Sequence, residues 1–468
     1  MKNKTNQMTD RGMLFTILTL AWPTMLEQLM QTAVQYIDTA MVGSLGTRAT
    51  AAVGSTGTVN WLIGSTISAV GVGFLSYIAK SYGADDQTAA KRAAAQAVLC
   101  TCVLGVIFTA LTLSLSGMIP VWMQVEAGIQ EMASLYFMIL YLPMLPRTAS
   151  IIFGTVLRSA GDTKSPMKIG LLVNFINVVL NFLMIYPARQ VEVFSIHFTV
   201  WGAGLGVIGA AIASAAAFTT GGICITRELF RHKEISPRGQ RFSPDMQILR
   251  PCLRVAFPNM LQRFGTSLGY VAFAAMINSL GEVSTAAHTI ANTVESAFYI
   301  PGYGMQTAAA TLAGNAYGAN DGKRMKKLAS IFIPLEMILM TGSGACLFLA
   351  APALMRLFSV HEAVISLGTT VLRMVAVSEP FYGFSIIIEG FMMGVGKTKA
   401  PFVYNMIGMW LVRIAGTFVC TQFLGRGLVS AWACMIIHNL LLFALFLVCY
   451  MRGIWNPFHS DSKKNNFK

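Results

Sequence analysis

One carboxylate lies inside a segment that is otherwise long and apolar. Asp38 belongs to the stretch Ala21–Gly46, AWPTMLEQLMQTAVQYIDTAMVGSLG, which is long enough to span a bilayer. Helical rise places it about 9 Å inside the end near Ser44, and an ionised acid at that depth is costly enough to indicate ion or proton transport. A structural aspartate would instead reach the interface or pair with a base. The arginine expected within the membrane in the first half of the chain, Arg147, is placed toward the opposite face.

Three asparagines offer polar groups at a matching depth. Asn174, Asn177 and Asn181 in NFINVVLN are spaced i, i+3 and i+7, so they share one face of a helix. Asn181 lies about as far from the end of its apolar run as Asp38 does from its own. A carboxylate with amide oxygens suits Na⁺, and the carboxylate alone can carry a proton. Amides at this period also hold helices together, so a packing role stays open.

The second half of the chain carries its own intramembrane charges. Glu295, in TVESAFYIPGYG, is expected near mid-membrane, and three arginines are expected at comparable depth: Arg263, Arg373 and Arg413. Glu295 is therefore either a second cation or substrate site or one member of a structural ion pair.

Four further residues are candidates for substrate binding or gating. Glu27 is an acid in the inner half of the first apolar run, and Glu379 precedes Pro380, which opens the backbone beside it. Tyr36 is one of several aromatic residues that suit flat lipophilic cations, although most aromatics in a membrane protein face lipid or core. Arg263 completes this set.

The composition places these residues in a membrane protein. Of 468 residues, 55% are hydrophobic and 12% are charged, and the mean hydropathy is +0.61, whereas a soluble protein carries about 25% charged residues. Apolar runs long enough to span a bilayer recur along the chain, which predicts an all-α polytopic membrane protein with twelve transmembrane helices. The predicted ranges are 14–43, 50–79, 93–116, 130–153, 166–186, 201–228, 250–278, 285–315, 328–350, 364–390, 401–422 and 428–451.

The sequence repeats itself at an offset of 235 residues. Ala256–Gly281 matches the stretch that holds Asp38, with Phe273 in place of the acid, and the YGA triplet at 82–84 returns at 317–319. Each copy holds six predicted helices, so we expect two lobes related by pseudo-twofold symmetry. The predicted divisions are an N-lobe at 1–232, a cytoplasmic linker at 233–249, and a C-lobe with a cytoplasmic tail at 250–468.

The basic residues concentrate on one side of the predicted membrane domain. The net charge is +14, and the predicted outer loops hold only Arg48, Arg189, Arg356 and Arg426. The positive-inside rule then places both termini in the cytoplasm. The basic excess is a topology signal, so no nucleic-acid partner is expected.

Four motifs resemble those of the multidrug and toxic compound extrusion (MATE) family. They are DTAMVGSLG in the first predicted helix, YGADDxxxxKR after the second, LRSAGDTKSP after the fourth, and VESAFYIPGYGMQTAAATLAGNAYGAND through the eighth. The resemblance covers nearly the whole chain. It implies a twelve-helix, two-lobed antiporter that exports organic cations against an inward Na⁺ or H⁺ gradient. We expect a monomer in the bacterial inner membrane, with no cofactor besides the coupling ion.

The resemblance also implies a cation site. In archaeal and DinF-type members this site falls on Asp38, Asn177 and a second acid at position 181. Here that position is Asn181, which halves the charge of the site and leaves both Na⁺ and H⁺ open. Ser214 is the residue that would complete the site, and no other metal is expected.

The family contains two patterns for the second half. The NorM-type pattern has a glutamate where this chain has Thr266. DinF-type members often carry an acid where Glu295 stands, so the DinF-type pattern is the closer one.

A flippase and a membrane enzyme are the two alternatives to an antiporter. A lipid-linked oligosaccharide flippase of the same superfamily would need a strongly cationic cavity, for which Arg263, Arg373 and Arg413 are candidates. A polytopic membrane enzyme would need a catalytic His/Asp or Asp/Asp set near one membrane face, and the sequence offers none. The chain is therefore not expected to be an enzyme.

Overall fold

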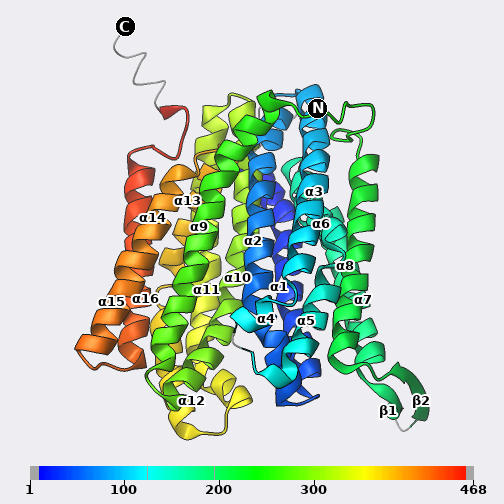
Figure 1. The fold of residues 1–468 in the computed structure, drawn as a ribbon. Helices are drawn as coiled ribbons and strands as arrows, with labels where there is room; N and C mark the ends of the chain where they lie inside the picture. Colours follow the sequence, from blue (N-terminus) through cyan, green and yellow to red (C-terminus); the bar gives the residue numbers. More distant parts are fainter. Residues whose placement is uncertain (1–9, 124, 194–195, 460–468) are drawn as a thin grey trace. The chain divides into compact units, whose positions relative to one another are not determined.

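The computed structural model describes residues 10–123, 125–193 and 196–459, without the side chains of residues 55, 56, 58, 191–198 and 200. Long helices dominate it, as predicted (Figure 1). In order along the chain, the elements are α1 (Asp10–Gly43), α2 (Thr47–Gly83), α3 (Gln87–Leu115), α4 (Ile119–Trp122), α5 (Ala127–Tyr141), α6 (Met144–Ser159), α7 (Lys164–Ile185), β1 (Pro187–Val193), β2 (Ile196–Ala203), α8 (Gly206–Arg231), α9 (Met246–Asn278), α10 (Glu282–Gly318), α11 (Gly322–Phe358), α12 (Glu362–Ala376), α13 (Glu379–Gly394), α14 (Lys399–Met406), the π-helix η1 (Ile407–Ile414), α15 (Ala415–Phe418), the π-helix η2 (Val419–Phe423) and α16 (Leu428–Met451).

The helices have the length and composition of membrane spans. Eight are long and apolar enough to cross a bilayer, and up to ten if each of two bent pairs counts as one span. The 33-residue α9 and the 37-residue α10 are also long enough, and they complete the predicted twelve. Large apolar side chains face outward on several of them, including Val106, Phe175 and Leu349 at 63%, 67% and 76% exposure. Such exposure suits a lipid-facing surface.

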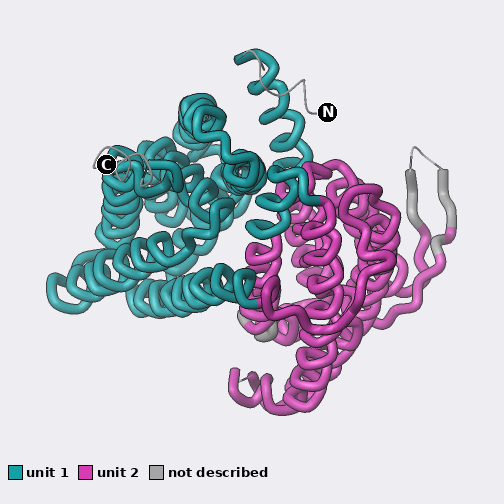
Figure 2. The backbone as a smooth tube through the Cα atoms, turned by 90° about the horizontal axis from the view of Figure 1, so that it is seen from above, with its two compact units in different colours: residues 1–26, 75–86, 250–468 teal, residues 27–74, 87–249 magenta. Residues whose placement is uncertain are grey.

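The chain forms two compact units, which Figure 2 shows in different colours. Unit 2 comprises residues 27–74 and 87–249. Within it α8 packs against α5, α6 and α7, and α3 packs against α6. Gly222 of α8 lies against the backbone of Pro146 in α6, where a Cβ atom would overlap it. Small residues of this kind allow the close helix packing that is typical of membrane bundles.

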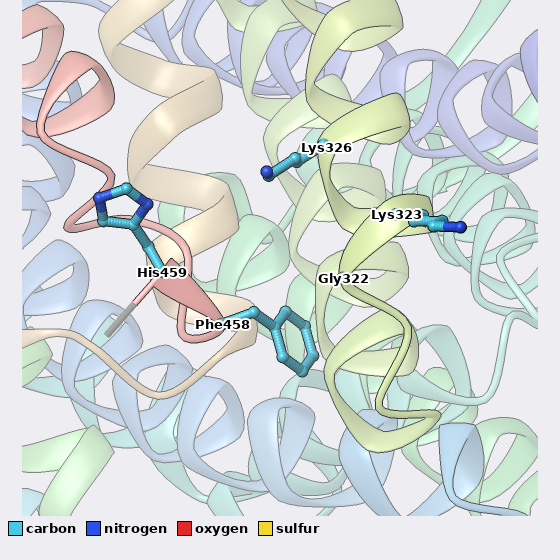
Figure 3. A pocket seen from close by; sticks show the side chains of 5 residues that line it. All are labelled: Gly322, Lys323, Lys326, Phe458 and His459. Carbon is cyan, nitrogen blue, oxygen red and sulfur yellow. The ribbon is translucent and has the colours of Figure 1, made fainter. Parts of the chain in front are cut away.

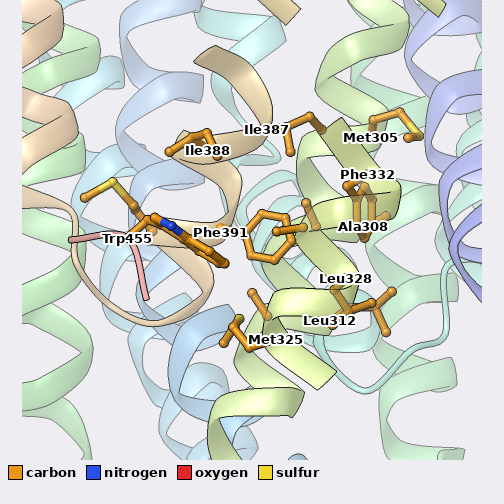
Figure 4. Packing of buried hydrophobic residues seen from close by; sticks show 14 of the residues in the cluster. Met305, Ala308, Leu312, Met325, Leu328, Phe332, Ile387, Ile388, Phe391 and Trp455 are labelled. Atoms are coloured by element: carbon orange, nitrogen blue, oxygen red, sulfur yellow. The ribbon is translucent and has the colours of Figure 1, made fainter. Parts of the chain in front are cut away.

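Unit 1 comprises residues 1–26, 75–86 and 250–468. Within it α10 packs against α11 and α13, and α13 packs against α16. Its core contains Phe332, Phe391 and Trp455, which stack edge to face (Figure 4). The predicted division at 1–232 and 250–468 follows the sequence repeat, whereas packing places 1–26 and 75–86 in the unit of the second half.

Two predicted helices are bent. The helix predicted at 130–153 is α5 and α6, which meet at 52°, and the helix predicted at 364–390 is α12 and α13, which meet at 51°. Pro143 lies at the first bend and Pro380 just after the second. Proline lacks the N–H group that would continue the helix, so the ladder is interrupted at both places.

A β-hairpin precedes α8, and the sequence analysis missed it. Strands β1 and β2 pair antiparallel, with Gln190 opposite Thr199. The helix predicted at 201–228 therefore begins later, at Gly206. The signal was available in the alternating run of β-branched and aromatic residues in RQVEVFSIHFTVWG, which is typical of strands.

The predicted linker at 233–249 packs on α3. Gln96 donates to the carbonyl of Ser243 at 2.8 Å and accepts from the backbone N–H of Asp245 at 3.0 Å, and Arg92 forms an ion pair with the Asp245 carboxylate. Ile235 is fully buried. This segment is therefore part of unit 2 rather than a free connection.

Candidate cation-binding site

Two amide side chains donate to the Asp38 carboxylate within unit 2. Asn181 Nδ2 donates to Asp38 Oδ1 at 2.6 Å. The amide of Asn177 gains Asp38 as an acceptor when its nitrogen faces that carboxylate, and it then gives up the 3.2 Å hydrogen bond that its oxygen accepts from Asn181 Nδ2 in the other orientation. It then donates to Oδ1 at 2.8 Å and to Oδ2 at 3.1 Å, while its oxygen accepts from Ser214 Oγ at 3.1 Å. The structure thus brings together the four residues Asp38, Asn177, Asn181 and Ser214.

Three helices position these groups. Asp38 lies on α1, the two asparagines lie one turn apart on α7, and Ser214 lies on α8. The spacing of i and i+4 on α7 turns both amides to one side. Asn177 and Asn181 are 5% and 1% exposed, so both amides are enclosed by the surrounding helices.

The arrangement can stabilise a negative charge on Asp38, and it can also neutralise that charge by binding a cation. Charge-assisted hydrogen bonds from two amides stabilise the ionised carboxylate. The oxygen of Asn181 is buried and has no hydrogen-bond partner among the described residues. Rotation of the amides would present their oxygens beside the carboxylate, and such a hard-oxygen set suits Na⁺. A protonated Asp38 would equally need an amide oxygen to accept its proton.

The one intramembrane arginine expected in this half is occupied elsewhere. Arg147 Nη2 donates to Asn60 Oδ1, which also accepts from Tyr141 at 2.9 Å. Its guanidinium carbon lies 4.7 Å from the ring of Phe218. Asp38 takes part in no ion pair within the described part of the chain. Among the described residues, no basic side chain therefore holds the Asp38 carboxylate.

The equivalent place in the second repeat has the opposite charge. Phe273, the counterpart of Asp38, lies under the guanidinium of Arg413, with 4.3 Å between that carbon and the ring. Tyr270 covers the same cation at 4.9 Å. A cation would be repelled here, so the repeats differ in chemistry.

Glu295 lies in unit 1 on α10 and is 6% exposed. Arg413 acts on it electrostatically, but the described residues include no ion pair of Glu295 within 4.0 Å. Glu379, 2% exposed, acts electrostatically on the same group, and its Oε2 has no partner among the described residues. The two acids are therefore neighbours, which the sequence did not indicate.

The remaining candidates have the following surroundings. Glu27 receives two hydrogen bonds of 2.7 Å from Arg158 Nη2 and is held in an ion pair. Arg263 donates to Asn259 Oδ1 at 3.0 Å, one turn earlier on α9. Tyr36 is 39% exposed.

The arginines that are candidates for a cationic cavity contact different residues. Arg373 is exposed and lies 5.3 Å from the ring of Phe348, and Arg413 is enclosed by aromatic rings. Nothing in the spacing of Asn60 and Tyr141 along the sequence links them to Arg147, which they contact in the structure.

A surface hollow lies at the start of α11 in unit 1. It is lined by Gly322, Lys323, Lys326, Phe458 and His459, and Figure 3 shows Lys326 pointing toward the hollow. It contains none of the predicted site residues.

Known proteins share this sequence pattern along most of the chain. The sequence model of the MatE family matches residues 23–183 and again residues 258–419, so the two matches begin 235 residues apart, as the internal repeat requires. A probable multidrug resistance protein NorM of Thermotoga maritima is 27% identical over 94% of this chain and 92% of its own. The human multidrug and toxin extrusion protein 1 is 23% identical over 97% of this chain and 79% of its own.

Solved structures share the fold. A MATE crystallised in complex with MaL6 superposes with a TM-score of 0.87 at 24% identity, covering 97% of both chains. A transporter of the MOP superfamily from Pyrococcus furiosus, described as having a binding pocket of reverse polarity, superposes with a TM-score of 0.85 at 24% identity, covering 94% of this chain and 96% of its own. The matched family segments, which cover more than half of the chain, identify it as a member of the MatE family, the multidrug and toxic compound extrusion transporters.

Proposed function

We propose that this chain is a secondary active antiporter that exports organic cations, including drugs, across the bacterial inner membrane in exchange for inward Na⁺ or H⁺. The observation that carries the proposal is the Asp38 carboxylate, which lies in a membrane helix and is bound by amides rather than by a base. The names of relatives such as NorM and the human extrusion protein support the substrate class.

The orientation of the Asn177 and Asn181 amides distinguishes the ion-free state of Asp38 from its ion-bound or protonated state. With nitrogens facing Asp38 the site stabilises a free carboxylate; with oxygens facing it, the site binds Na⁺ or accepts the proton of a protonated acid. The Asn177 oxygen accepts from Ser214 in the first arrangement, so this hydrogen bond must change in the second. Coupling to the drug then requires only that drug and ion prefer different states of the protein.

The second half favours the DinF-type pattern. Thr266 stands where the NorM-type pattern has glutamate, and Glu295 supplies an acid on α10. The relatives named NorM are less than 30% identical to this chain, so we infer the subtype from the site residues instead. We expect a monomer with both termini in the cytoplasm, following the positive-inside rule.

The flippase alternative has less support. A phosphate-binding cavity needs several cations that converge, yet Arg413 lies between aromatic rings and Arg373 is exposed. Arg263 is bound to Asn259 on its own helix.

Ethidium efflux from cells tests the antiporter. We expect the wild-type chain to export ethidium, and export to collapse on adding a protonophore or on removing sodium, whichever ion drives it. Asp38→Asn should insert normally and retain less than about a tenth of the efflux, because an amide cannot carry the charge that the cycle exchanges. The control is Glu131→Gln, an exposed acid on α5.

Wild-type efflux by Asp38→Asn would refute the coupling role. Absence of ethidium export by an inserted wild-type chain would favour the flippase.

A further inference from the structure

A carboxyl group in unit 1 is enclosed without a hydrogen-bond partner among the described residues. Glu336 lies on α11 and is 0% exposed. Neither Oε1 nor Oε2 has a hydrogen-bond partner among the residues that the structure describes, and no ion pair there includes it. Buried polar groups are almost always paired, so an acid with two unpaired oxygens requires an explanation.

Two glycines form the cradle of this carboxyl. A Cβ atom on Gly302 of α10 would lie 2.6 Å from Glu336 Oε1, and one on Gly383 of α13 would lie 3.2 Å from its Cγ. The other neighbours at Gly302 are apolar, namely Met340 and Ile386. Both helices therefore have a glycine where they pass Glu336, and this leaves room for its carboxyl group. Neither helix provides a polar side chain that hydrogen-bonds to it.

The surroundings determine the charge of the group in this conformation. Transfer of a carboxylate into an apolar site without a partner is so costly that the group takes up a proton instead. Glu336 is therefore a neutral acid here. An acid that stayed neutral throughout would contribute nothing that an apolar residue of the same shape could not.

The helices around Glu336 are interrupted close to it. Pro301 immediately precedes Gly302 on α10, and Pro334 lies two residues before Glu336 on α11. On the third side, α12 and α13 meet at 51°, with Pro380 three residues before Gly383. Prolines mark the places where membrane helices bend, so local movement of these helices would open the enclosure.

The facing helices carry titratable and charged groups, none of which forms a hydrogen bond or ion pair with Glu336 among the described residues. Tyr303 and Tyr382 share a hydrogen bond of 2.8 Å between their hydroxyls, beside the two glycines in sequence. Arg373, on α12, is exposed and donates to the carbonyl of Phe348. The titratable and charged residues on the elements packed against α11 are Glu282, His288, Glu295, Tyr299, Tyr303 and Tyr317 on α10, Glu362 and Arg373 on α12, and Glu379, Tyr382 and Glu389 on α13.

We propose that Glu336 is a second proton-binding site of the transport cycle, separate from Asp38. In the conformation seen here its carboxyl holds a proton. When the interrupted helices part, the O–H bond breaks, the proton passes to water, and the carboxylate that remains takes up a proton again before the helices close. This role rests on the proposed antiport, which supplies the conformational cycle.

Infrared difference spectroscopy of the reconstituted full chain tests the proposal directly. A pH step should produce the carbonyl band of a protonated carboxyl in the wild type, and this band should be absent from Glu336→Gln but present in Asp38→Asn. Ethidium efflux by Glu336→Gln should fall at least tenfold and lose its pH dependence, because glutamine mimics the neutral acid but cannot release a proton. Glu362→Gln, an exposed acid on α12, is the matched control.

The outcomes separate this proposal from the proposed function. Wild-type efflux and an unchanged carboxyl band in Glu336→Gln would overturn the role of Glu336 and leave Asp38 untouched. If Glu336→Gln does not accumulate, Glu336→Asp should shift the carboxyl band, and an unshifted band would overturn the proposal equally. Loss of the antiport itself would appear instead as no ethidium export by the wild type.

Discussion

The Asp38 site is defined by which atoms of its neighbours face the carboxylate. Asn177 and Asn181 both donate N–H groups to it, and Ser214 donates to the oxygen of the Asn177 amide. This arrangement gives a single negative charge with neutral partners. Where archaeal and DinF-type members have a second acid, this chain has Asn181, and we propose that the lower charge allows a proton to compete with Na⁺.

A second carboxylate should therefore shift the site toward sodium. In Asn181→Asp two acids would face each other across the present 2.6 Å hydrogen bond, and like charges at that distance cannot both ionise unless a cation lies between them. We expect the sodium dependence of efflux in membrane vesicles at fixed pH to rise at least fivefold. Asn174→Asp, on the same helix outside these contacts, should change it little, and an equal response of both variants would contradict the assignment.

At the scale of elements, the two repeats meet through a pair of glycines in unit 1. A Cβ on Gly83, at the end of α2, would overlap the carbonyl oxygen of Asn315 on α10, and one on Gly318 would overlap that of Lys80. Gly83 and Gly318 are counterparts in the repeat, as are Lys80 and Asn315. The crossing is therefore reciprocal, and it explains why the YGA triplet recurs.

A side chain at this crossing should loosen it. Gly318→Leu is expected to destabilise the folded chain by about 2 kcal/mol, the usual cost of overpacking, seen as a lower melting temperature of the purified protein. Gly342→Leu on α11 is the control, because a Cβ there meets nothing within 4 Å. Equal melting temperatures for the two variants would show that the crossing tolerates a side chain.

At the scale of the whole molecule, a duplicated sequence has produced two different sites. The first repeat places Asp38 among amides, and the second places Phe273 against Arg413. The basic loops add a second asymmetry, because almost all of them fall on one predicted side. Orientation and coupling thus both depend on features that the repeats do not share.

The orientation can be measured with fusions. Green fluorescent protein joined to the C-terminus should fluoresce, because the positive-inside rule places that end in the cytoplasm. Alkaline phosphatase joined after Gly204, between β2 and α8, should be active because the same rule places this connection on the outer side. The opposite pair of results would invert the topology.

The sequence by itself determined the helical membrane class and the repeat, because hydrophobic length and internal similarity are local properties of the chain. The depth of Asp38, counted from helical rise, stays a prediction. The same count also places Asn181 level with Asp38, since both depths are counted from helix ends. Only the tertiary structure decided that Arg147 turns to Asn60 rather than to Asp38, that Glu295 neighbours Glu379, and that Glu336 lies between two glycines without a partner. These relations join residues on different helices, and their geometry depends on how the helices pack, which no spacing along one chain segment encodes.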